Sequence, residues 1–169
     1  MKPILNPGDI FCTRNPMALG RIINGMQKFW SPDNQSEYSH SGIILDSKGN
    51  TFESLWTIKR SNLNTYIGKK ILIGRHINMN SKLFQIGFDK IKHHEGQWYP
   101  MHRLPLFIIP PLAKYIATGY FPVCSELAAK FLYRCYLLEE NWKGKNPDHI
   151  ADMIIKWKVF EVIFEGEWT

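Results

Sequence analysis

Residues 121–127, Phe-Pro-Val-Cys-Ser-Glu-Leu, hold the feature that decides the fold: a proline, then a cysteine, then a run of helix formers. The run continues through Ala128, Ala129 and Lys130, which all favour a helix. We therefore predict a helix that begins at Cys124. A thiol is mostly protonated at neutral pH, and the positive end of a helix dipole favours its reactive thiolate form. Cys124 is thus a candidate nucleophile.

A nucleophilic cysteine needs a base, and the six histidines of the chain differ in how firmly the local sequence would hold them. His40 begins a strand between two serines, and a strand can hold an imidazole in one orientation. The others are predicted after a strand, at a helix end, in a loop or in a turn: His76, His93, His94, His102 and His149. We therefore select His40 as the candidate base.

The strand from His40 is followed by the turn Ser47-Lys48-Gly49-Asn50 and a second strand at residues 51–56, which together predict a β-hairpin. In this hairpin Glu53 can share a sheet face with His40. A carboxylate there would fix the imidazole tautomer and stabilise its charged form. The residues alone still leave a plainer alternative open, in which Cys124 is a small buried side chain and His40 is structural.

Five short motifs occur along the chain in one order, namely residues 6–11 (NPGDIF), 39–45 (SHSGIIL), 52–54 (FES), 96–99 (GQWY) and 123–128 (VCSELA). In this order they resemble the circularly permuted NlpC-like hydrolases of the YiiX/YebB type, a papain-like group in which the histidine precedes the cysteine. Residues 146–150 (NPDHI) extend the resemblance, which covers the chain from Pro7 to about Met153.

The resemblance implies Cys124 as nucleophile, His40 as general base and acid, and Glu53 as the residue that orients His40. It implies that the backbone N–H of Cys124 is one oxyanion donor and that Tyr99, Tyr120 and Phe121 contribute to substrate binding. The chain departs from the family pattern at Pro100 and in the apolar, proline-rich residues 104–111.

The remaining pattern predicts one α+β domain over residues 1–169. The resemblance implies that this domain has a circularly permuted papain-like fold, with an antiparallel sheet packed against helices. Further strands are predicted at residues 10–13, 70–75 and 159–164, and further helices at 16–30, from Ser81 to Ile91, and after Pro147. Residues 93–111 are predicted to form a long loop.

Composition excludes several classes of protein. The formal charge of +6 is spread in pairs of basic residues, so no nucleic-acid partner is expected. Three cysteines without close spacing argue against disulfides and a cysteine-rich zinc site. The N-terminal residues lack a secretory signal and residues 104–113 are too short to span a bilayer, so a cytoplasmic protein is expected.

The expected reaction is hydrolysis of an amide bond in a small peptide or at a lysine amide, without a cofactor or metal. A lipid-like ester or thioester is the alternative substrate, and an acyltransferase the related activity, because residues 104–111 are apolar. An inactive binding module on the same scaffold is a second alternative. A metal site at His93, His94, Glu95 and His102 is a third, although it lacks the usual ligand spacing. The oligomeric state is left open.

Overall fold

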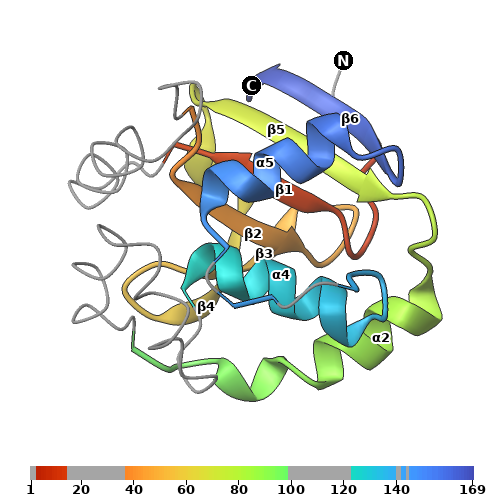
Figure 1. Ribbon diagram of the computed structural model, residues 1–169. Helices are drawn as coiled ribbons and strands as arrows, with labels where there is room; N and C mark the ends of the chain where they lie inside the picture. The colour runs from red at the N-terminus through yellow and green to blue at the C-terminus, as the bar shows by residue number, and fades with distance from the viewer. Residues whose placement is uncertain (1–2, 15–36, 99–122, 140–141, 144) are drawn as a thin grey trace.

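The computed structural model describes residues 3–14, 37–98, 123–139, 142–143 and 145–169 (Figure 1). These residues form six strands, three α-helices and two short 3₁₀ helices. Their bounds are β1 Ile10–Thr13, β2 His40–Ile44, β3 Asn50–Ser54, β4 Ile58–Asn62, η1 Leu63–Tyr66, β5 Lys70–His76, α2 Ser81–Asp89, η2 Lys92–His94, α4 Cys124–Arg134, α5 Pro147–Lys156 and β6 Phe160–Glu167.

All six strands join in one sheet of order β4-β3-β2-β1-β5-β6, and every neighbouring pair is antiparallel. Helices α4 and α5 lie against this sheet, and α2 packs on α4 (Figure 1). The α+β class and the antiparallel sheet are as predicted from the sequence.

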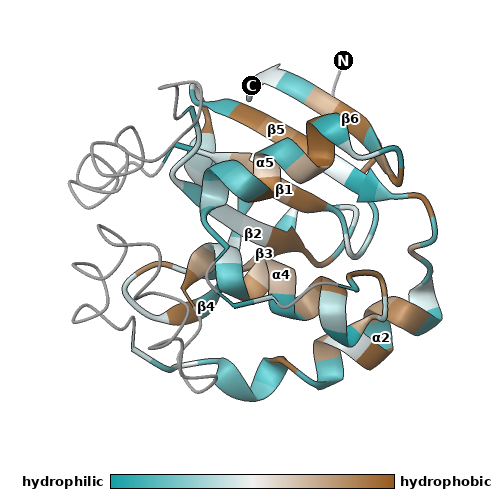
Figure 2. Cartoon of the chain, viewed as in Figure 1, coloured by the Kyte–Doolittle hydropathy of each residue, from teal (hydrophilic) through white to brown (hydrophobic). Residues whose placement is uncertain are grey.

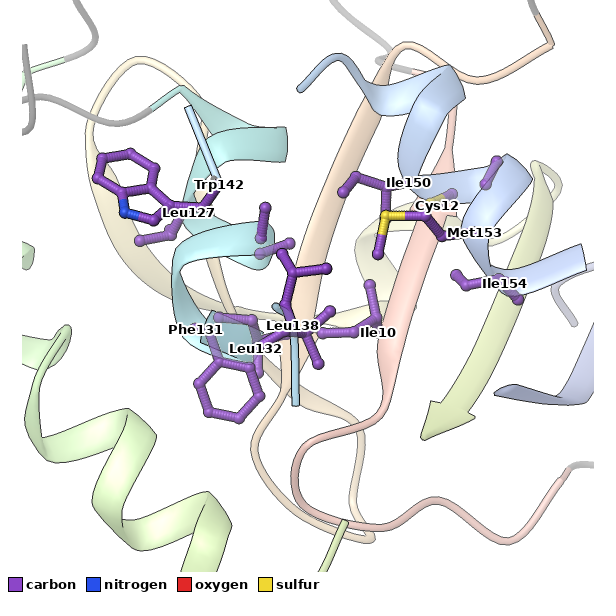
Figure 3. Packing of buried hydrophobic residues seen from close by; sticks show 14 of the residues in the cluster. Ile10, Cys12, Leu127, Phe131, Leu132, Leu138, Trp142, Ile150, Met153 and Ile154 are labelled. Atoms are coloured by element: carbon purple, nitrogen blue, oxygen red, sulfur yellow. The ribbon is translucent and has the colours of Figure 1, made fainter. Parts of the chain in front are cut away.

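Successive side chains of each strand point to opposite faces of the sheet, so the apolar side chains form two clusters, one on each face. Ile10, Cys12 and Ile43 belong to the cluster that includes the apolar side chains of α4 and α5, several of which are drawn in Figure 3. Phe11 and Ile44 belong to a second cluster that includes Leu5, Leu63, Tyr66, Ile71, Ile73 and Trp168. Figure 2 shows hydrophobic residues along β1 and the first part of β5, and neighbouring residues there are buried on both faces of the sheet.

Local sequence explains where the helices begin. The side chain of Asn146 accepts a hydrogen bond from the backbone of His149 at 2.7 Å, and Pro147 occupies the first turn of α5. His149, predicted in a turn, therefore lies in this helix. Asn80 caps α2 by accepting from the backbones of Lys82 and Leu83.

Most predicted elements are present with shifts of a few residues at their ends. The predicted second hairpin strand at residues 51–56 is β3, and the predicted last strand at 159–164 continues to Glu167. Strand β4 was not predicted, because its sequence IKRSN has no alternation of apolar residues. The strand is extended because it pairs with β3 at the edge of the sheet. The predicted helix at 16–30 lies outside the described residues.

Candidate active site

The candidate site lies where the start of α4 meets β2 and β3. His40 is the first residue of β2, and Glu53 is the fourth residue of β3. In the hairpin register Glu53 stands opposite Gly42, which is two residues from His40 and so on the same face. The predicted sharing of a face by His40 and Glu53 is therefore confirmed.

Gly42 is the residue that lets these groups approach. A Cβ atom at this position would lie 2.6 Å from the ring of Phe11 and 3.0 Å from the Cβ of Glu53, which is closer than packed atoms come. The ring of Phe11 in turn packs edge-on against the ring of His40, with their centroids 5.9 Å apart. The glycine of the motif at residues 39–45 thus has a packing reason.

His40 and Glu53 form a buried ion pair. Nε2 of His40 lies 2.6 Å from Oε2 of Glu53, and neither side chain is exposed to solvent. Glu53 also accepts hydrogen bonds from the hydroxyls of Tyr66 and Thr51, the latter at 2.9 Å from Oε1. A buried carboxylate requires such donors, and together they hold it in one position.

Tyr66 and Thr51 were not identified from the sequence. Thr51 is two residues from Glu53 on the same strand face, so its contact could have been inferred from the alternation of a strand. Tyr66 comes from η1 and reaches Glu53 only through the tertiary fold. Burial and the negative charge of Glu53 raise the pKa of Tyr66, so its hydroxyl stays protonated and acts as a donor.

Cys124 is the first residue of α4, as predicted, and is 3% exposed. The side chain of Glu126 accepts a hydrogen bond from the backbone of Val123 at 3.3 Å, and Ser125 donates to the carbonyl of Lys145 at 2.6 Å. The first helical hydrogen bond of α4 runs from the N–H of Leu127 to the carbonyl of Val123. The N–H of Cys124 precedes it and has no acceptor within the helix.

The surroundings of His40 favour its charged form. Burial alone lowers the pKa of His40, but interactions with Cys124 and Glu53 outweigh burial and raise this pKa to about 9. Burial raises the pKa of Glu53, whereas His40, Tyr66 and Thr51 lower it, with a net lowering. Nε2 of His40 faces Glu53, and Nδ1 has no hydrogen-bond partner among the described residues. Nδ1 is therefore the ring nitrogen that can exchange a proton with a thiol.

We expect an NMR titration of the imidazole signals to give His40 a pKa of about 9 rather than the ordinary 6.5. The Glu53→Gln variant should titrate at lower pH, because the charge that helps hold the proton is gone. Thr51→Val, which removes a hydrogen bond to the same carboxylate but keeps its charge, serves as the control and should shift the titration less. An unchanged pKa in Glu53→Gln would contradict the coupling.

The same pKa shifts set the direction of the pH dependence of stability. A raised pKa of His40 stabilises the fold fully below about pH 6.5, and this contribution is lost as pH rises through about 9. The lowered pKa of Glu53 contributes above its ordinary value of 4.5 and is lost as pH falls below it. The pair therefore contributes most between these two ordinary values.

Other candidates from the sequence are placed differently or not described. Tyr99, Tyr120 and Phe121 lie outside the described residues, as does His102.

His94 has both ring nitrogens engaged, Nδ1 with Gln97 at 2.8 Å and Nε2 with Nζ of Lys130 at 2.7 Å. Within the described ranges no group of three or more His, Cys, Asp or Glu side chains could hold a metal ion. Both ring nitrogens of His94 therefore have side-chain partners in place of a metal ion.

Sequence comparisons give no match to this chain. No family model matches it, and no curated protein does. In the part of the chain that the structure describes, no helix is long and apolar enough to cross a membrane.

The fold, in contrast, is similar to a solved structure. The crystal structure of the metalloprotein YiiX from Escherichia coli O157:H7, described as DUF1105, superposes with a TM-score of 0.58 at 16% sequence identity. The match covers 96% of this chain and 89% of the YiiX chain. The chain therefore has a YiiX-like fold, in agreement with that part of the resemblance found in its motifs.

Proposed function

We propose that this protein is a cysteine hydrolase of the permuted papain-like type, with Cys124 as nucleophile, His40 as base and acid, and Glu53 as the residue that orients His40. The observation that carries the proposal is the buried contact between His40 and Glu53, which leaves Nδ1 of His40 for the thiol. An imidazole held in one tautomer by a carboxylate is what a thiol needs to become a nucleophile.

The proposed reaction has two steps. The thiolate of Cys124 attacks the carbonyl carbon of an amide, forming a C–S bond, while the N–H of Cys124 donates to the developing oxyanion. The imidazolium of His40 then gives its proton to the leaving amine, and the C–N bond breaks. Water, deprotonated by His40, attacks the resulting thioester and releases the acid and the thiol.

The proposed substrate is an amide in a small peptide or at a lysine side chain. A lipid ester or thioester, or acyl transfer in place of hydrolysis, is the second candidate, and it is favoured by the apolar sequence of residues 104–111. The description "metalloprotein" belongs to the YiiX structure, and the proposed reaction uses only side chains and backbone groups of this chain.

Trapping the acyl-enzyme tests the proposal. The full-length protein would be mixed with activated amide, ester and thioester probes, quenched in acid, and measured by intact-mass spectrometry with peptide mapping. We expect an added acyl mass on the peptide that contains Cys124, together with a burst of leaving group. The class of probe that gives the faster burst identifies the substrate class. If no probe class forms an adduct at Cys124, the hydrolase proposal is wrong and the binding-module alternative gains support.

A further inference from the structure

A groove of about 470 Å³ lies at the C-terminal end of α4. Three segments line it: the end of β5 with the residues after it, the residues that follow α4, and the connection from α5 to β6. The lining residues are His76, Asn78, Tyr136, Leu137, Glu139, Trp157 and Val159. Because Cys124 begins α4 and eleven helical residues rise about 16 Å, this Tyr136 groove is separate from the candidate active site.

Tyr136 stands at a backbone position that favours glycine. Its φ is 61°, in the left-handed region, and among the described residues it is the one non-glycine with positive φ. The N–H of Leu137 donates to the carbonyl of Leu132 at 3.0 Å, so α4 ends in a Schellman motif with Tyr136 at its left-handed position. A tyrosine at this position therefore costs backbone conformational energy that a glycine would not.

Burial does not explain this tyrosine. Its side chain is 73% exposed, so it adds little to the core. The ring is nevertheless held, because Nζ of Lys90 donates to the hydroxyl at 3.1 Å and lies 5.0 Å from the ring centroid. An exposed aromatic ring at a strained position is better explained by binding than by stability.

The polar groups that line the groove indicate which chemical class of ligand it can bind. The N–H of Asn78 donates to Nδ1 of His76 at 3.2 Å, and burial lowers the pKa of His76. The imidazole is therefore neutral at pH 7 and carries its proton on Nε2. Asn78 offers an amide and Glu139 a carboxylate. The ammonium of Lys90 lies 5.0 Å from the centroid of the Tyr136 ring, so a cationic ligand on this ring would meet a like charge.

We propose that the Tyr136 groove binds a neutral carbohydrate, with a pyranose ring against its aromatic side chains. A sugar ring has an apolar C–H face that stacks on an aromatic surface and hydroxyls that pair with amide, imidazole and carboxylate groups. The groove volume is within the range of small-molecule sites. This site is independent of the proposed hydrolase activity.

The test is an amide NMR titration of the full-length protein with cellobiose and with N,N′-diacetylchitobiose. Sorbitol, which has hydroxyls but no ring, and choline, an organic cation, are the comparison ligands. We expect a ring sugar to shift the amide signals of Asn78, Leu137 and Val159 and to bind with a measurable Kd. Cys124→Ala should bind equally well, which separates this site from the proposed catalysis.

Two variants make the test specific. Tyr136→Gly removes the ring and supplies the residue that the backbone favours, so binding should weaken at least about tenfold while the thermal midpoint is kept or rises. Tyr133→Ala is the matched control, because Tyr133 is 40% exposed on the last turn of α4 but does not line the groove. The proposal is overturned if neither sugar shifts these signals, if sorbitol or choline binds as well, or if Tyr136→Gly binds like the wild type.

Discussion

The Cys124→Ala variant is expected to lose at least about 10³-fold in turnover, because without the thiol no thioester can form. The substitution removes one buried sulfur at the start of α4 and leaves the contacts of Ser125 and Glu126 in place, so the fold should persist. Turnover of the best probe substrate and the thermal midpoint would be measured on the same preparation. A loss of turnover with a nearly unchanged midpoint assigns the effect to chemistry.

The other two cysteines supply the controls for this experiment. Burial, helped by the nearby Cys124 and Asp148, raises the pKa of Cys12 well above its ordinary value. Burial likewise raises the pKa of Cys135 to about 12, although Gly87 and Lys90 oppose the rise. Both thiols should therefore stay protonated and unreactive at neutral pH. Cys12→Ala and Cys135→Ala are therefore expected to retain turnover. If Cys124→Ala also retained turnover, Cys124 would not be the nucleophile.

The His40→Ala variant should slow alkylation of Cys124 by iodoacetamide at pH 7 about tenfold to thirtyfold, since only a few per cent of an ordinary thiol is ionised there. Turnover should fall further, by about 10³-fold or more, because the leaving amine also loses its proton donor. Labelling rates would be measured from pH 5 to pH 10 in a background that lacks Cys12 and Cys135. At neutral and lower pH, Cys124 should be labelled faster in the wild type than in His40→Ala, because the variant lacks the imidazole that accepts the thiol proton.

His76→Ala is the matched control for this profile. His76 is also a buried histidine on a strand, but it is the last residue of β5 and packs edge-on against the ring of Phe160, with the centroids 5.1 Å apart. Its removal should leave the labelling profile of Cys124 unchanged. Identical profiles in wild type and His40→Ala would show that no thiolate–imidazolium pair exists and would favour a binding role for the scaffold.

Much of the site was predictable because its elements are locally encoded. Helix formers after Cys124 place this residue at a helix start. The hairpin turn was predicted at residues 47–50 and lies one residue earlier, at residues 46–49, in the register that brings Glu53 opposite Gly42. The hydrogen bonds of these elements are made between nearby residues, so short-range sequence determines them. Strand β4 shows the limit of this reasoning, since its polar sequence becomes a strand through its neighbour.

The sequence by itself therefore determined an α+β chain with Cys124 at the start of a helix and His40 and Glu53 on one face of a hairpin. Only the tertiary structure decided that Tyr66 donates to Glu53, that Phe11 packs against His40, and that α4 brings Cys124 to the imidazole. It also decided that Tyr136 stands at an exposed left-handed position beside Lys90. These contacts join residues that are not neighbours in sequence. They form when the helices and strands pack into the core, so no local pattern predicts them.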